Sequence, residues 1–491
     1  MVTAPLLFLS YPVHHLNLNI IIIRIQGEIG DDFLERKNDF SKGSIIRNIM
    51  NMAIPMILAQ IVNVLYSIVD RLYIARIPNE SFDALTGIGI CLPVISIVMA
   101  FANLFGMGGA PLCSIERGRG NLEEAEHIMG NSFIMLTYTG IILTILGLIF
   151  KKPMLYLFGA SDITYKYANE YITIYLLGNI FVMISLGMNH FINSQGFSRI
   201  GMLTVTLGAV TNIILDPIFI FLFNMGIRGA AIATVTSQFL SAAWVLKFLT
   251  GENAIFRLNK KSFTLKWNRI KNILALGVSG FVMQFTNSLV QIILNTTLQQ
   301  FGGDLYVGIM TVINSIREFA MMPITGLTRG AQPVMGFNYG AGKYDRVKKC
   351  IKFITIFTLT INTLMWTIIQ GFPEFFIKMF NEDPAIIEAG VPMIRIFYLG
   401  FFLMSLQQSG QNTFVALGKS KFATFFSIFR KVILVVPLAI LLPRVSSLGH
   451  IGVFLSEPIS EFIGGVACYA TMMLTVWKEL RGGSYEENQQ S

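Results

Sequence analysis

The sequence contains few charged residues for its length. Only 13% of its 491 residues are Asp, Glu, Lys or Arg, whereas soluble domains carry about 25%. Hydrophobic residues make up 53% of the chain, and its mean hydropathy is +0.62. This composition is typical of a polytopic membrane protein and predicts an all-α integral membrane fold that has the lipid bilayer as a partner.

Several features of enzymes and metalloproteins are missing. Four scattered cysteines (Cys91, Cys113, Cys350 and Cys468) have neither metal-site spacing nor a disulfide pattern, so we expect them to be packing residues. No phosphate-binding loop of the GxxxxGK[ST] type occurs, which argues against ATP as the energy source. His190 is the one histidine well inside an apolar stretch. We therefore expect no cofactor and no enzymatic activity.

Twelve apolar stretches are long enough to cross a bilayer, which takes about 20 residues. They lie near 45–75, 84–112, 127–150, 165–193, 200–223, 227–249, 270–298, 305–337, 351–370, 385–412, 422–442 and 450–477. A polar stretch between the sixth and seventh divides the chain. The predicted domains are a tail (1–43), a six-helix lobe (44–250), a linker (251–268), a second six-helix lobe (269–478) and a second tail (479–491).

Lys and Arg predict the orientation of these helices. Basic residues cluster in the 6–7 and 8–9 connections, for example at Lys260, Lys261, Lys348 and Lys349. The positive-inside rule then places both tails in the cytoplasm. The same rule accounts for the net charge of +9 without a nucleic-acid partner. We expect a monomeric, multi-pass protein of the cell membrane.

The two halves repeat. Gly108 and Pro111 recur 222 residues later as Gly330 and Pro333. The same offset relates other pairs: Gly118 and Gly340, Leu177-Gly178 and Leu399-Gly400, and Gly196 and Gly418. Six helices per half give both repeats the same orientation, so the lobes should be related by a pseudo-twofold axis along the membrane normal. This is a known transporter architecture, with the substrate path between the lobes.

The first apolar stretch carries unusual polar residues. Pro55 removes a backbone donor, so we expect a bend there. Asp70 lies near the far end, where a buried carboxylate is costly unless it is paired or protonated. Asn63 and Tyr66 precede it on the same helical face and are candidates for lining a substrate cavity.

A second acid lies in the fifth stretch. Asn212 and Asp216 are four residues apart and share a helical face, while Thr234 lies early in the sixth stretch. Together with Asp70 they should lie in the outer half of one lobe. Such a group could bind a small hard cation through oxygen ligands, Na⁺ for example, or share and release a proton. The alternative is that each acid caps a helix end or pairs with Arg71 or Arg228.

The second half of the chain does not repeat the acids of the first half at the corresponding positions. Its intramembrane polar residues are mostly amides, and the candidates for the substrate cavity there are Gln284, Asn287, Gln291, Gln407 and Gln411. Helix packing through amide hydrogen bonds is an equally good interpretation. We expect at least some of Arg317, Glu318, Glu457 and Glu461 to form ion pairs.

Three segments resemble the multidrug and toxic compound extrusion (MATE) family, within the multidrug/oligosaccharidyl-lipid/polysaccharide exporter superfamily. They are AIPMILAQIVNVLYSIVDRLYIAR, TNIILDPIFIF with GIRGAAIATVTSQ, and PITGLTRGAQPVMGFNYGAGKYDRVKK. The resemblance covers about residues 45–478. It implies a cation or proton site at Asp70, Asn212, Asp216 and Thr234, with Pro55 as a bend linked to its occupancy. Coupling through acids on helices 7 and 10 is not implied, because this sequence has Gln and Asn there.

The resemblance implies a secondary-active exporter of cationic or amphipathic small molecules, driven by Na⁺ or H⁺ through alternating access. A flippase for lipid-linked saccharides in the same superfamily is the main alternative. It should carry several basic residues in its cavity, whereas intramembrane arginine is sparse here (Arg317, Arg329, Arg395 and Arg430). An integral-membrane enzyme is the third alternative.

Overall fold

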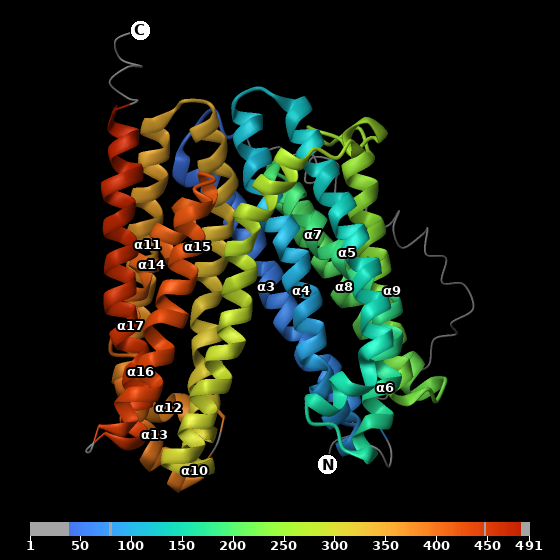
Figure 1. The fold of residues 1–491 in the computed structure, drawn as a ribbon, viewed down its shortest axis with the longest axis vertical. Coiled ribbons are helices and arrows are strands. Elements are labelled where there is room, and N and C mark those ends of the chain that lie inside the picture. The colour runs from blue at the N-terminus through green and yellow to red at the C-terminus, as the bar shows by residue number, and fades with distance from the viewer. Residues whose placement is uncertain (1–38, 78–80, 381, 446–447, 483–491) are drawn as a thin grey trace. The chain divides into compact units, whose positions relative to one another are not determined.

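The computed structural model describes residues 39–77, 81–380, 382–445 and 448–482, and within them every regular element is helical. Most of the predicted N-terminal tail lies outside these ranges. The first half contains α3 (Ile45–Ile74), α4 (Ser81–Gly118), α5 (Leu122–Leu157), α6 (Asp162–Leu177), α7 (Asn179–Ser194), α8 (Ser198–Pro217), η2 (Ile218–Leu222) and α9 (Gly226–Thr250). These helices lie together in Figure 1, coloured blue to green.

The second half begins with η3 (Lys260–Phe263) and α10 (Trp267–Gly340). It continues with α11 (Tyr344–Gly371), α12 (Pro373–Lys378), α13 (Pro384–Phe397), η4 (Phe401–Leu403), α14 (Met404–Ala416), α15 (Ser420–Ile428), η5 (Phe429–Val435), α16 (Val436–Leu441), η6 (Leu442–Arg444), α17 (Gly449–Met472) and η7 (Met473–Trp477). The last helix continues to Gly482, and Leu480 is fully buried in the core.

Helix α10 consists of two helices that meet at Gly303. A straight helix of 74 residues would be about 110 Å long, more than three times the thickness of a bilayer core. Gly303 has non-helical dihedral angles (φ 71°, ψ −170°), a conformation that glycine adopts without strain. Among the described residues, nine helices could cross a membrane, or eleven if two bent helix pairs each count as one crossing.

The repeated Leu-Gly dipeptide marks both bends. α6 and α7 meet at 57° around Gly178, and α13 and the helix that follows Gly400 meet at 40°. Both glycines are closely packed: a β-carbon on Gly178 would collide with Val235, and one on Gly400 would lie 2.9 Å from the carbonyl oxygen of Pro458. The repeat in sequence is therefore also a repeat in local structure.

Three hydrophobic cores hold the described helices. One is built from residues between Ile74 and Ile273, in α3–α10. The other two are built mainly from α10–α17, and one of them includes the first turns of α3 through Ile45, Ile49 and Met52. Many large apolar side chains remain exposed, such as Ile149 and Leu474. Outward-facing apolar residues are what a lipid environment requires.

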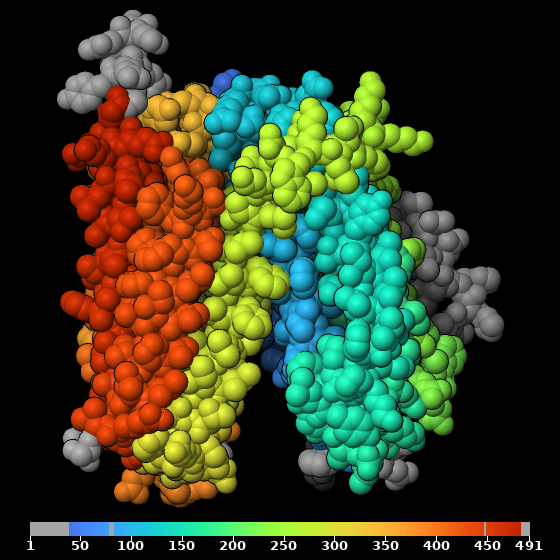
Figure 2. All heavy atoms as spheres, in the orientation of Figure 1, coloured from blue at the N-terminus to red at the C-terminus, as the bar shows by residue number. Residues whose placement is uncertain are grey.

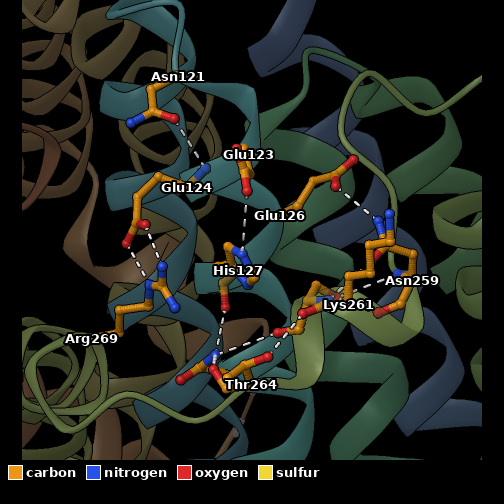
Figure 3. Close-up of polar contacts among 11 residues, drawn as sticks. Asn121, Glu123, Glu124, Glu126, His127, Asn259, Lys261, Thr264 and Arg269 are labelled. Carbon is orange, nitrogen blue, oxygen red and sulfur yellow. Dashed lines mark hydrogen bonds and ion pairs between the residues drawn. The ribbon is translucent and has the colours of Figure 1, made fainter.

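The predicted linker packs closely on α5 (Figure 3). Asn131 of α5 donates a hydrogen bond to the carbonyl of Thr264 (2.9 Å), and the Asn259 amide donates to Glu126 (2.8 Å). Arg269, in the first turn of α10, donates two hydrogen bonds of 2.6 Å each to the Glu124 carboxylate. Bidentate pairs of this kind are among the stronger polar contacts in proteins.

The described part of the N-terminal tail is also held in place. Phe40 is fully buried, with the Arg117 guanidinium 4.8 Å and the Phe337 ring 5.9 Å from its ring centroid. Arg346 of α11 donates to the carbonyls of Phe40 and Gly43, both at 3.0 Å. The segment therefore contacts both α4 and the second half of the chain.

Helices α4 and α10 are in close backbone contact at their C-terminal ends, and the contacts are reciprocal. A β-carbon on Gly118 would collide with the carbonyl oxygen of Phe337, and one on Gly340 would collide with that of Ile115. Gly340 is the repeat partner of Gly118, and Phe337 lies 222 residues after Ile115. A twofold relation produces contacts of this reciprocal kind.

We predict that Gly118→Ala lowers the stability of the folded protein, because the added methyl must push backbone away from backbone. The expected loss is about 1–3 kcal/mol, measured as thermal unfolding in detergent. Gly89→Ala is the matched control, since Gly89 is also helical but a β-carbon added there would meet nothing within 4 Å. At that position alanine should be neutral or stabilising. Equal effects at both positions would contradict the close-packing explanation.

Candidate functional site

Two carboxyl groups meet in the first half of the chain, and neither forms an ion pair with a basic side chain of the described residues. The Asp70 side chain of α3 lies against that of Asp216, in the last turn of α8. Asp216 is fully buried, and one oxygen of each carboxyl group has no hydrogen-bond partner within the described residues. Arg71 is exposed, and Arg228 pairs instead with Glu170 (2.9 Å). The sequence alternative of an ion pair with Arg228 is therefore not what the structure shows.

The other two predicted residues complete the group. With its amide turned to suit its neighbours, Asn212 donates to Asp216 Oδ2 (2.7 Å) and accepts from the Thr234 backbone N–H (3.2 Å). Asn212 lies one helical turn before Asp216, and Thr234 lies in α9. Three helices thus bring together Asp70, Asn212, Asp216 and Thr234.

Sequence reasoning missed two tyrosines of α6 beside this group, Tyr171 and Tyr175. The hydroxyl of Tyr171, like that of Tyr66, approaches the Thr234 side chain. Tyr171 and Tyr175 stack with ring centroids 6.3 Å apart, and both are buried. The signal that could have identified them is their spacing of four residues, which places both on one face of the helix.

The chemistry of this group follows from its charge. Two carboxylates buried together cannot both remain ionised without a compensating positive charge, because low dielectric strengthens their repulsion. A proton between them, or a cation bound to their oxygens, would supply it. The described residues contain no group of three or more His, Cys, Asp or Glu that could hold a metal ion. Cation binding here would therefore use amide, hydroxyl and phenol oxygens besides the two carboxylates.

Pro55 interrupts the hydrogen bonds of α3, and another helix compensates. Proline has no N–H to donate to the carbonyl four residues earlier, which is that of Asn51. The Ser198 hydroxyl, at the start of α8, donates to that carbonyl instead (3.1 Å). α3 continues as one helix from Ile45 to Ile74, so the predicted bend at Pro55 stays a prediction.

A cavity of about 340 Å³ lies among α3, α4, α7, α8, α9 and α10, on the N-terminal side of Asp70 along α3. Asn63 and Tyr66 line it, as proposed from the sequence. Neutral polar groups and methionines supply much of the remaining wall, among them Gln60, Asn103, Asn189, Asn193, Gln238, Met56, Met107 and Met202. Methionine adapts its shape to varied apolar surfaces. Tyr66 connects the cavity with the carboxyl pair.

The candidates in the second half lie elsewhere. Gln284, Asn287 and Gln291 are exposed on α10. Gln407 donates to the Phe426 carbonyl (3.5 Å) and Gln411 to the Ala423 carbonyl (2.8 Å), which places both between α14 and α15. None of the five lines the cavity described above. Their role in a substrate path stays a prediction.

The expected ion pairs of the second half are present. Glu457 of α17 contacts Arg317 (3.4 Å), Arg430 (3.0 Å) and Lys431 (2.7 Å), and Glu457 is buried. Lys431 was missed from the sequence, although its position beside Arg430 in the middle of the apolar stretch near 422–442 could have identified it. Here each cation contacts an acid, whereas Asp70 and Asp216 contact no basic side chain within the described residues.

The surface between α10 and α4–α6 is deeply hollowed at the lower end of the molecule as drawn in Figure 2. The other end, where Gly118 and Gly340 cross, is closed by backbone contact. In the described part of the chain, these helices therefore separate toward the hollowed end.

Comparison with known proteins identifies the family of this chain. The MatE family model matches residues 55–218 and 281–441, more than half of the sequence. The multidrug export protein MepA of Staphylococcus haemolyticus is 24% identical over 424 residues, covering 86% of this chain and 92% of the relative.

Solved structures agree with this in fold. An outward-facing MATE transporter of the MOP superfamily is 22% identical, with a TM-score of 0.83 over 91% of this chain and 99% of that one. A MATE protein in a conformation described as bent has the same identity and TM-score, over 91% and 98%. On the extent of the family match, this chain belongs to the MatE family of membrane transporters.

Proposed function

We propose that the chain is a secondary-active multidrug efflux antiporter. It exports amphipathic or cationic small molecules across the cell membrane in exchange for Na⁺ or H⁺. The observation that carries this proposal is the pairing of Asp70 with Asp216 without an ion pair to a basic residue in the described part of the chain. The multidrug export named for the staphylococcal relative supports the choice of substrates.

The proposed layout is twelve helices in two six-helix lobes, 44–250 and 269–478, related by a pseudo-twofold axis along the membrane normal. Dividing α10 at Gly303 supports the helix number. The reciprocal contacts of Gly118 and Gly340 support the axis. In this layout both tails are cytoplasmic, the closed end of the molecule faces the cytoplasm, and the hollow in Figure 2 faces outward.

In the proposed mechanism, Asp70, Asn212, Asp216 and Thr234 hold the coupling ion. A proton or Na⁺ removes the repulsion between the two carboxylates, and its release restores it. The ion can shift the population of two conformations only if it interacts differently with each. Tyr66 contacts both the ion group and the cavity, so its position is suited to link ion occupancy to substrate binding.

We propose that α3 is the helix that changes conformation when the coupling ion binds or leaves. It carries Asp70 at one end and Pro55 near the other, where the backbone hydrogen bond is replaced by the Ser198 hydroxyl. The hydrogen bond from the Ser198 hydroxyl can break while the other backbone hydrogen bonds of α3 stay intact. The bent conformation described for a similar transporter fits this role.

We predict that Asp70→Asn abolishes gradient-driven efflux while substrate binding persists. An amide removes the charge that the coupling ion must neutralise. Asp216→Asn should have the same effect, and the double variant should be little worse than either single one, because the two groups act as a unit. The measurement is dye efflux in proteoliposomes with independently imposed Na⁺ and pH gradients.

The matched control for these variants is Asp304→Asn, an exposed aspartate next to the turn at Gly303. It should transport at the wild-type rate. Wild-type efflux in either the Asp70 or the Asp216 variant would disprove coupling at this pair. Which imposed gradient drives the wild-type protein identifies the ion.

We predict an energetic coupling between Pro55 and Ser198. Ser198→Ala alone should cost about 1 kcal/mol of stability, because the Asn51 carbonyl loses its donor. In a Pro55→Ala background the backbone N–H of residue 55 can donate to the Asn51 carbonyl. Removing the Ser198 hydroxyl should then change the stability little. Thermal unfolding of the four proteins gives the coupling energy.

The same Pro55→Ala variant should turn over more slowly, since α3 gains a regular hydrogen bond where the mechanism needs it to bend. Efflux rates at saturating substrate measure this. An equal stability loss for Ser198→Ala in both backgrounds, together with unchanged turnover, would show that the proline is only a tolerated irregularity.

A further inference from the structure

One cation in the cavity wall has no partner among the described residues. Arg329 of α10 lines the cavity, and within the described residues it makes no hydrogen bond, ion pair or close approach to an acid. No aspartate or glutamate of the described chain lines the cavity. An unpaired guanidinium in a membrane protein is costly unless something neutralises it.

The buried cations of the second half are paired with an acid, as is usual for charged groups inside a membrane protein. Arg317, Arg430 and Lys431 all contact Glu457. Each of these three cations therefore has an acidic partner inside the protein. Arg329 differs because its charge remains available at the surface of a cavity.

The carboxyl pair is too distant to serve as a counter-ion for Arg329. Gly326 packs on Ile57 of α3 and Gly330 packs on Ala53, so Arg329 lies level with this part of α3. Asp70 lies thirteen residues beyond Ile57, about 20 Å along the helix. The positive charge in the cavity wall and the acidic pair therefore lie at different depths along α3.

Neutral hydrogen-bonding groups surround Arg329. Gln332 lies three residues later on α10 and lines the same cavity, as do His190 and Asn193 of α7. Amides supply donors that can add to a guanidinium contact with an anionic group. Arginine presents parallel N–H groups that match a carboxylate in a bidentate pair.

We propose that the cavity binds small amphipathic molecules by a carboxylate held at Arg329, with Gln332 beside it and the methionines around the apolar body. The preferred substrates would then include zwitterionic and anionic carboxylic acids as well as cations. This inference deepens the proposed efflux function and rests on it for the direction of transport, but the binding itself requires no gradient.

The test uses two dyes that differ at one group. Tetramethylrhodamine has a free carboxylate, and its methyl ester is a cation of nearly the same shape. Binding of each to the purified full-length protein in neutral detergent is measured by fluorescence anisotropy. Arg329→Gln should weaken binding of the free acid about tenfold or more, while binding of the ester changes less than twofold. Arg329→Lys should retain part of the affinity for the acid.

Arg395→Gln is the control, since Arg395 is exposed on α13 outside the cavity; it should leave both affinities unchanged. An equal loss for acid and ester in Arg329→Gln would overturn the proposal, and so would failure of the wild-type protein to bind the acid. Efflux of the ester tests the proposed function separately. If efflux proves independent of any gradient while the acid still depends on Arg329, antiport fails and the carboxylate site stands.

Discussion

Charge buried in a membrane protein must be neutralised, and the three ways in which this chain meets that constraint explain most of its organisation. In the second half, three cations each contact the Glu457 carboxylate inside the protein. In the first half, Asp70 and Asp216 face each other without an ion pair in the described chain, so that a shared proton or a bound cation must compensate their repulsion. Arg329 is the opposite case, a cation that needs an anion. The two unsatisfied places are where ligands would be expected to bind.

Glycines allow the helices near these two sites to pack closely. Gly118 and Gly340 bring α4 and α10 into backbone contact at one end, and the hollow between the same parts of the chain opens at the other (Figure 2). The buried Phe40 lies against Arg117 and Phe337, at the closed end. An exporter needs one side sealed while the other is open, and small residues at helix crossings are a low-cost way to make a seal that can separate.

Much of this arrangement could be predicted from the sequence. Hydrophobic periodicity and length gave the helices, because a membrane helix satisfies its backbone locally. The 222-residue repeat paired Gly178 with Gly400, and the structure then showed that both lie at bends. The grouping of Asp70, Asn212, Asp216 and Thr234 followed from helical spacing, depth and family resemblance. The bend at Pro55 and the ion-coupling role are still predictions.

Composition, helix positions and the intramembrane acids were determined by the sequence alone, because each depends on the chain within a few turns. Only the tertiary structure decided which groups meet. Ser198 serves the carbonyl freed by Pro55, Tyr171 approaches Thr234, Lys431 reaches Glu457, and Arg329 has no partner within the described chain. Each of these depends on helices distant in sequence packing at a particular angle and depth. Local spacing determines the face on which a side chain lies, and the packing of the whole bundle determines what that face meets.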